Sequence, residues 1–319
     1  MPLIEAIPNL SNGKDLALLR LLAQEALKDN GARLLHMDPN PDANRTVFTF
    51  AGTPQDIIKA CFNLFIAAAQ HIDMRLQHGA HPRLGAVDVC PLVPLQEISL
   101  AETAIFADKL ARRVAEELQI PVYLYEENAS TPQRKDLSFI RRGEYENLPK
   151  KLKTLPPDYG PKTWNSHIAQ TGATVIGARN FLIAFNMSLN TQEVPLAKQI
   201  AAKLRAKNGG LPAVKAIGWY LENYKCAQVS CNVTDYHQTG LAPLFEACKK
   251  EAAQLGITVT GSEIIGLVPE EALVQAGQFY LPDEQDTTLL LRTSTENLLL
   301  NHVRPFDAHA QILEHILSK

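Results

Sequence analysis

The chain has 319 residues, of which 46% are hydrophobic and 20% are charged, and its formal net charge is -3. This length and composition are typical of a globular protein with about two domains, and the absence of a basic patch argues against general nucleic-acid binding. The first residues lack the basic and apolar layout of a secretory signal peptide, and no apolar run approaches the ~18 residues that span a bilayer. We therefore expect a cytoplasmic protein that binds neither nucleic acid nor membrane.

In the first half of the chain, alternation and helical periodicity predict the order β-α-β-β-α-β. The expected elements are a strand at 3–7, a helix at 15–30, strands at 33–37 and 45–50, a helix from 54 to about 74 and a strand at 84–93. Thr53 can cap the second helix, and Pro54 suits its first position. This order is the split βαβ pattern of ferredoxin-like folds.

An added segment follows this pattern. Ser99 and Glu102 form a capping box for a helix to about 118, and a strand is expected at 121–125. Residues 128–171 are polar and proline-rich, which predicts a long irregular connection with room for one short helix. Connections of this length are usually functional or linking.

The second half repeats the β-α-β-β-α-β order. The expected elements are a strand within 174–187, a helix at 195–207, strands at 214–221 and 227–233 joined as a hairpin, a helix at 241–255, a strand at 257–260 and one or two helices within 284–319. We therefore expect an α/β protein of the α+β sandwich type. Its two ferredoxin-like βαββαβ subdomains, residues 1–178 and 179–319, are expected to face each other across a ligand crevice.

The five cysteines are odd in number and widely spaced, at Cys61, Cys90, Cys226, Cys231 and Cys248. Only Cys226 and Cys231 lie close together, and a C-x4-C pair without a second pair is a poor zinc pattern. We expect each cysteine to be a small apolar core residue, and we expect no metal site.

A histidine and an arginine precede the apolar strand expected at 84–93. His81 follows a glycine–alanine pair and precedes the rigid Pro82, and Arg83 comes next. The proline biases the backbone of His81 toward an extended shape, and an imidazole with a pKa near ~6.5 both takes and gives a proton near neutrality. The pattern favours equally a general acid/base at a sheet edge and a turn histidine bonded to the backbone.

Polar residues also occupy the turn between the two strands expected at 33–37 and 45–50. Asp38 ends the first strand and Arg45 begins the second, with Asn44 among the turn formers between them. An ordinary β-β turn is the simpler interpretation. The alternative places these three residues at the same sheet edge as His81, where a carboxylate orients an imidazole or holds an ammonium and a guanidinium grips a carboxylate.

Glycines and a tryptophan lie at the end of the polar connection. Gly172 and Gly177 allow close backbone approach to a flat ligand, and Trp164 can stack on one. The spacing fits neither a Walker nor a dinucleotide motif. A linker whose glycines serve only the turn is the alternative.

Together these stretches resemble the formimidoyltransferase domain of the glutamate formimidoyltransferases, the folate enzymes of histidine breakdown. The resembling segments are IPNLSNGK (7–14), NRTVFTFAG (44–52), HPRLGAVDVCPLVP (81–94), RVAEELQIPVYLYE (113–126), IRRGEYENLPKKL (140–152), GATVIGARNFLIAFN (172–186), IGWYL (217–221), AQVSCN (227–232) and GSEIIGLVPEEAL (261–273). The resemblance implies transfer of a formimidoyl group from N5 of tetrahydrofolate, a co-substrate, to L-glutamate. It also implies two facing α/β subdomains with folate in the groove between them.

The resemblance also assigns roles to residues. It places the catalytic histidine of the His-Pro-Arg motif at His81. Substrate-binding roles are expected for Asp38, Asn44, Arg45, Arg83 and Arg179. The folate-binding segment is expected to comprise Gly160, Pro161, Lys162, Thr163, Trp164, Asn165, Ser166, His167, Ile168, Ala169, Gln170, Thr171 and Gly172, of which residues 165–170 have no clear counterpart in the family.

One further departure from the family and two alternative functions remain. The familiar bifunctional members continue into a cyclodeaminase domain, so a separate protein is expected to close the ring. A homodimer is plausible for such an enzyme. A transferase or folate-salvage enzyme that uses 5-formyltetrahydrofolate, and a non-catalytic folate-binding module, stay open as alternatives.

Overall fold

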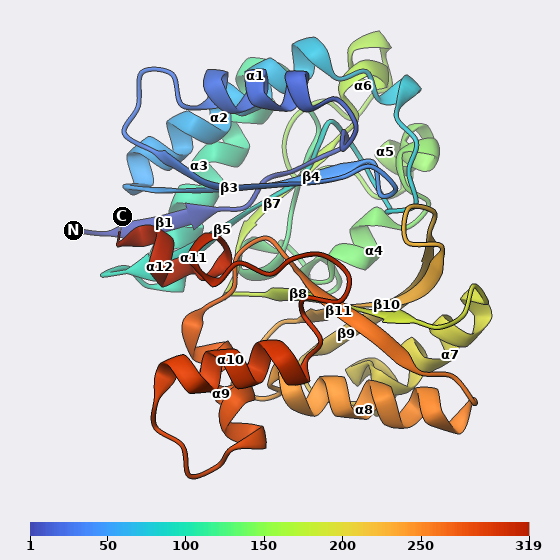
Figure 1. Cartoon of the computed structure of the whole chain (residues 1–319). Helices are drawn as coiled ribbons and strands as arrows, with labels where there is room; N and C mark the ends of the chain where they lie inside the picture. The colour runs from blue at the N-terminus through green and yellow to red at the C-terminus, as the bar shows by residue number, and fades with distance from the viewer. Residues whose placement is uncertain (319) are drawn as a thin grey trace. The chain divides into compact units, whose positions relative to one another are not determined.

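The computed structural model describes residues 1–318 and divides along the chain into two compact units, which meet between Asn180 and Phe181 (Figure 1). Unit 1 contains a seven-stranded sheet and unit 2 a four-stranded sheet, each accompanied by helices. The predicted mixed α/β class is therefore confirmed. The sequence predicts the division two residues earlier, and the predicted crevice between subdomains stays a prediction.

The sheet of unit 1 combines an antiparallel part with a parallel edge. Its strands are β1 (Leu3–Ala6), β2 (Asn9–Leu10), β3 (Arg33–Asn40), β4 (Arg45–Gly52), β5 (Val87–Gln96), β6 (Val122–Leu124) and β7 (Thr174–Ala178). They run β3, β4, then β1 with β2, then β5, β7 and β6. β7 is parallel to both β5 and β6, and the other pairs are antiparallel. Pro8 separates β1 from β2 because proline has no amide hydrogen for the ladder.

Three long helices cover one face of this sheet (Figure 1). They are α1 (Leu16–Ala26), α2 (Pro54–His71) and α3 (Leu100–Leu118). The Thr53 side chain accepts a hydrogen bond from the amide of Asp56, and Ser99 and Glu102 cap α3 reciprocally, so both predicted caps are confirmed. Apolar side chains from all three helices and from alternate strand positions form the main core of the unit.

The connection between β6 and β7 holds more structure than the sequence predicts. It forms α4 (Leu137–Arg141), α5 (Leu148–Thr154) and α6 (Ser166–Thr171), so the prediction of room for a single short helix is wrong. These helices share a second, smaller core with Tyr123 of β6 and Val175 of β7. Neighbouring strand residues such as Val122 and Ile176 belong to the main core instead. Because side chains alternate along a strand, the short helices pack on the opposite sheet face.

Unit 2 has a simpler sheet. Its strands are β8 (Ile183–Leu189), β9 (Val214–Leu221), β10 (Cys226–Val233) and β11 (Val259–Ile265), in the order β11-β8-β10-β9 and all antiparallel. Its helices are α7 (Val194–Leu204), α8 (Leu241–Gln254), α9 (Glu270–Tyr280), α10 (Thr287–Asn297), α11 (Ala308–Gln311) and α12 (Leu313–Leu317). The sequence analysis did not predict α9, which adds Ala272 and Leu273 to the core.

The cysteines follow the prediction with one exception. Cys61, Cys90, Cys231 and Cys248 are buried, and Cys226 is only half-buried because it lies at the start of β10 beside a pocket. Among residues 1–318, no helix combines the length and apolar character needed to cross a lipid bilayer.

Candidate functional site

Three loops of unit 1 meet around the His-Pro-Arg motif. The amide of Ala80 donates to the carbonyl of Asp42 at 3.0 Å, which joins the motif to the turn between β3 and β4. The Ser11 hydroxyl donates to the carbonyl of Gly85 at 2.7 Å, which joins the motif to the segment after β2. A Cβ on Gly79 would lie 2.2 Å from the Ala43 carbonyl oxygen, so this contact requires glycine. These contacts bring together three of the segments that carry the family resemblance, at residues 7–14, 44–52 and 81–94.

His81 is half-buried, and its ring is oriented by the backbone. The Nδ1 atom lies 2.7 Å from the carbonyl oxygen of Pro82. Because a carbonyl oxygen only accepts, this contact assigns the hydrogen to Nδ1 and leaves the lone pair on Nε2. In the neutral ring, Nε2 is therefore the nitrogen without a hydrogen.

The charges around His81 favour its neutral form. Burial holds the pKa of the imidazole well below its ordinary value, and the positive charges of Arg45 and Arg141 lower it further. The negative charge of Asp88 and the contact with Pro82 oppose this shift without cancelling it. At neutral pH the ring is consequently unprotonated.

A fully buried carboxylate links the two arginines. Asp88, in β5, has no exposed side-chain surface and accepts from Arg45 Nη1 at 2.6 Å. Arg141, at the end of α4, donates to the same Oδ2 through Nη2 and to Oδ1 through Nε at 3.3 Å. The amide of Leu84 donates to Oδ1 at 2.8 Å. This Arg45–Asp88–Arg141 cluster binds together β4, β5 and the polar connection.

Electrostatics explain why the cluster stays charged. Burial raises the pKa of Asp88, but Arg141 and Arg45 outweigh burial, and the pKa lies below its ordinary value. Burial lowers the pKa of Arg45 to about 10, with Asp88 opposing the shift. Removing one partner of such a buried pair leaves an uncompensated charge, so the three groups depend on one another.

Asp88 and Arg141 were missed by the sequence analysis. Asp88 lies inside the apolar run 84–93, and an acidic residue within a buried strand is a usable signal because charges are almost never fully buried unless paired. Arg141 carried no comparable signal, since it is one of several basic residues in the polar connection.

Arg45 belongs to this cluster, and Asn44 precedes it in the turn between β3 and β4. Arg45 also donates from Nε to Asn9 Oδ1 at 2.9 Å. Asn44 adopts a φ of 46°, and its Oδ1 accepts from the amide of Gly13 at 3.1 Å. Asn44 therefore shapes the turn that places Arg45, and a substrate-binding role for either residue stays a prediction.

Arg83 is buried and already has acidic partners. Its Nη2 donates to Glu146 Oε1 at 2.5 Å, and its Nη1 lies 3.4 Å from Glu144 Oε2. The Nε atom donates to the carbonyl of Gln77 at 2.9 Å. These contacts attach the His-Pro-Arg motif to the polar connection.

The other two predicted substrate residues, Asp38 and Arg179, lie within β3 and directly after β7. Asp38 is buried in β3 opposite Val47 of β4. Arg179 follows β7, where its Nη1 donates to the carbonyl of Asn180 at 2.9 Å and its charge lowers the pKa of Tyr125 against the stronger raising effect of burial. The substrate-binding roles expected for Asp38 and Arg179 stay predictions.

The predicted folate-binding segment consists of a loop and α6. Lys162, Thr163 and His167 are exposed, and Trp164 is half-buried with its ring centroid 6.0 Å from that of Tyr145. The Tyr145 hydroxyl donates to the carbonyl of Ala169 at 2.5 Å. The segment is therefore held to the polar connection, while the side chains of Lys162, Thr163 and His167 stay accessible.

The end of this segment is fixed to the motif that contains His81. Gly172 adopts a φ of 69°, and a Cβ there would lie 2.4 Å from the Cα of Gly85. The amides of Ala86 and Ala173 donate across this contact, to Thr171 at 2.8 Å and Leu84 at 3.1 Å. Two glycines thus allow the expected folate segment and the motif to pair backbone to backbone.

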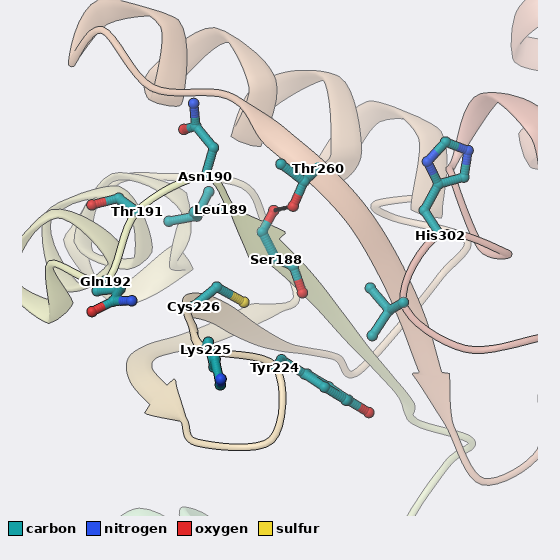
Figure 2. A pocket seen from close by; sticks show the side chains of 11 residues that line it. Ser188, Leu189, Asn190, Thr191, Gln192, Tyr224, Lys225, Cys226, Thr260 and His302 are labelled. Carbon is teal, nitrogen blue, oxygen red and sulfur yellow. Dashed lines mark hydrogen bonds between the residues drawn. The ribbon is translucent and has the colours of Figure 1, made fainter.

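A separate pocket of about 490 Å³ opens in unit 2 (Figure 2). It is lined by Ser188, Leu189, Asn190, Thr191, Gln192, Tyr224, Lys225, Cys226, Thr260, His302 and Val303. None of the predicted site residues lines it. Within residues 1–318, no group of three or more histidine, cysteine or acidic residues is arranged to hold a metal ion.

Comparisons with known proteins identify the family to which the chain is similar. Residues 3–179 match the family described as "Formiminotransferase domain, N-terminal subdomain", and residues 184–318 match "Formiminotransferase domain". The glutamate formimidoyltransferase of Streptococcus pyogenes serotype M1 is 39% identical over 99% of both chains. That of Thermoplasma acidophilum is 40% identical over 88% of this chain and 93% of its own.

The bifunctional relatives are longer. The formimidoyltransferase-cyclodeaminase of Rattus norvegicus is 41% identical over 99% of this chain, and the match spans 60% of the length of that relative. Both family matches together cover almost the whole chain. The chain therefore belongs to the formiminotransferase domain family.

Proposed function

We propose that the chain transfers the formimidoyl group of 5-formimidoyltetrahydrofolate to L-glutamate, reversibly, giving tetrahydrofolate and N-formimidoyl-L-glutamate. The observation that carries the proposal is the neutral imidazole of His81 beside the buried cluster of Arg45, Asp88 and Arg141. The names of two relatives supply the acceptor, glutamate, and the formimidoyl group, and the family resemblance supplies the folate donor. Tetrahydrofolate then serves as co-substrate.

In this proposal His81 acts first as base and then as acid. Nε2 removes a proton from the ammonium of glutamate, and the free amine attacks the formimidoyl carbon. The resulting tetrahedral centre collapses when the imidazolium returns the proton to N5, and the bond between carbon and N5 breaks. Because burial, Arg45 and Arg141 disfavour the imidazolium, it gives its proton readily to N5. The same shift makes the imidazole a weaker base toward the ammonium than a histidine whose pKa lies near the working pH.

The two arginines are the best-supported groups for the carboxylates of the substrates. Arg45 and Arg141 share the single carboxylate of Asp88, so the three groups together carry a net positive charge. Guanidinium groups bind carboxylates in two places. Arg83 is less well placed for this role because Glu144 and Glu146 already engage it, and Asp38, Asn44 and Arg179 stay candidates for the remaining polar groups.

The exposed side chains of the folate segment support a role in binding the folate. Trp164 offers an aromatic face, Lys162 offers a cation, and the pairing of Gly172 with Gly85 joins the segment to the motif of His81. Holding two substrates near one base supplies much of the rate in such transfers. Residues 160–172 are therefore proposed to contact tetrahydrofolate.

The strand orders support a finer proposal for the fold. Counting only the repeated β-α-β-β-α-β elements, and β1 with β2 as one strand, both units place their strands in the order fourth, first, third, second. We propose that both are ferredoxin-like. The cytoplasmic location, the homodimer and a separate cyclodeaminase acting on 5-formimidoyltetrahydrofolate stay predictions.

Product analysis tests the proposal directly. The purified chain is mixed with 5-formimidoyltetrahydrofolate and L-glutamate, and N-formimidoyl-L-glutamate is measured by mass spectrometry. Parallel reactions with 5-formyltetrahydrofolate measure formyl transfer. Turnover only with the formyl donor, or folate binding without turnover, would replace the proposed function with one of the two alternatives.

A further inference from the structure

A buried lysine lies behind the cluster that surrounds His81. Lys151, in α5, is 3% exposed, whereas Lys150 and Lys153 of the same helix are exposed. A lysine is almost never fully buried unless it is paired, and burying its ammonium carries a desolvation penalty. The proposed transfer reaction does not use this group.

Lys151 contacts the residue next to Arg141, a member of the Arg45–Asp88–Arg141 cluster. Its Nζ donates to the carbonyl of Ile140 at 2.5 Å, and Ile140 precedes Arg141 at the end of α4. Arg141 in turn donates to both oxygens of Asp88. The ammonium thus fixes the backbone from which the Arg141 side chain extends.

The charges that face Lys151 also come from this site. Burial lowers the pKa of its ammonium to about 8, and the nearby carboxylates of Asp88 and Glu144 oppose the shift. Asp88 belongs to the cluster, and Glu144 engages Arg83 of the motif. The ammonium of Lys151, in α5, is therefore close to two carboxylates of the site, those of Asp88 and Glu144.

We propose that Lys151 is a positioning residue that holds Arg141 against Asp88 and so sets the charge around His81. The proposal rests on the proposed transferase function, and it adds a residue that touches neither substrate. Arg141 disfavours the protonated form of His81. When Lys151 is lost, Arg141 moves, and the imidazole should become easier to protonate.

Histidine NMR tests this step without any turnover. The His81 ring signal is assigned with a His81→Asn variant, and its titration is followed in wild type, Lys151→Met, Arg141→Met and the exposed controls Lys150→Met and Lys153→Met. We expect the His81 pKa to rise in Lys151→Met and Arg141→Met and to match wild type in the controls. An unchanged His81 pKa in Lys151→Met, with a raised one in Arg141→Met, would overturn the proposal.

Steady-state kinetics provide the second measurement. We expect Lys151→Met to lower kcat/KM by about 10- to 100-fold, the scale on which slight misplacement of reacting groups acts. Lys151→Arg should recover part of the loss, and Lys151→Met should have no further effect in an Arg141→Met background. Equal losses in both backgrounds would contradict action through Arg141. Absent turnover in wild type and controls would reject the transferase function instead, and the NMR titration would still decide the role of Lys151.

Discussion

The two units bury an acidic residue in the last strand of the same repeated pattern, yet they surround it differently. In unit 1, Asp88 of β5 lies between Arg45 and Arg141. In unit 2, Glu263 of β11 accepts from Gln228 Nε2 at 2.9 Å and from the Tyr224 hydroxyl at 3.1 Å. One acid is held mainly by two cations, and the other mainly by neutral donors.

The difference originates outside the repeated pattern. Arg141 and Lys151 lie in the polar connection between β6 and β7, and no such connection separates the last two strands of unit 2. His81 lies in the loop before β5, the strand that carries Asp88. In the same loop, Arg83 forms ion pairs with Glu144 and Glu146 of the polar connection. The strands of the repeated pattern thus supply Arg45 and Asp88, and the added segment supplies Arg141 and Lys151.

Removal of the imidazole should have the largest effect on activity. We expect His81→Ala to lower kcat by about 100- to 10,000-fold, the usual contribution of a positioned acid/base group. His78→Ala changes an exposed histidine of the same loop and serves as the matched control. A folded His81→Ala variant with wild-type turnover in the product assay would refute the assignment.

The two buried acids should differ in their contribution to stability. Asp88→Asn leaves two arginines without a buried anion, and we expect a loss of about 3–5 kcal/mol in the free energy of unfolding. Glu263→Gln removes a carboxylate whose cationic neighbour, Arg304, is partly exposed and 3.4 Å away, and we expect about 1–3 kcal/mol. Urea denaturation measures both, and equal losses would remove the distinction between the units.

Two glycines with similar φ values sharpen the same comparison. Gly172 of unit 1 and Gly256 of unit 2 have φ values of 69° and 70°, but a Cβ would meet neighbours within 4 Å only at Gly172. Gly256→Ala should therefore show only the left-handed backbone penalty of about 1–2 kcal/mol. Gly172→Ala should lose about 1–3 kcal/mol more, because its ψ of -152° lies in a region essentially restricted to glycine and because the new Cβ overlaps Gly85. Unfolding curves that coincide would contradict this difference.

Much of the fold could be predicted from periodicity and caps, as the helix that begins at Thr53 and Pro54 illustrates. The polar connection could not, because α4 and α6 are too short for a helical period to emerge. Contacts between residues far apart in the sequence could not be predicted either. No local pattern indicates that Gly85 and Gly172 meet.

The site shows the same division between local and distant information. His81 and Arg45 could be singled out from the residues next to them, because a proline and a turn gave each a definite setting. The partnership of Arg141 with Asp88 joins residues 53 positions apart, and only the fold brings them together. Candidate site residues beside a turn could be proposed individually from the sequence. The charged residues that shift their pKa values could not.

The smallest predicted effect is on the pH dependence of kcat/KM. The charged cluster around His81 should keep kcat/KM nearly constant just below neutral pH. A catalytic base with an ordinary histidine pKa would lose half its activity at pH ~6.5. Because burial, Arg45 and Arg141 hold the His81 pKa well below that value, the acid limb of kcat/KM should lie at lower pH. We expect less than a twofold decrease between pH 7.5 and ~6.5.

The same shift has a defined sign for stability. The unfolded imidazole binds a proton near pH ~6.5 and the folded one resists it, so the folded state should lose stability as the pH falls below ~6.5. His81→Ala should weaken this acid dependence, which denaturation at several pH values measures. An acid limb centred at pH ~6.5, or identical acid sensitivity in the variant, would show that the arginines leave the base unperturbed and that the charged cluster serves stability alone.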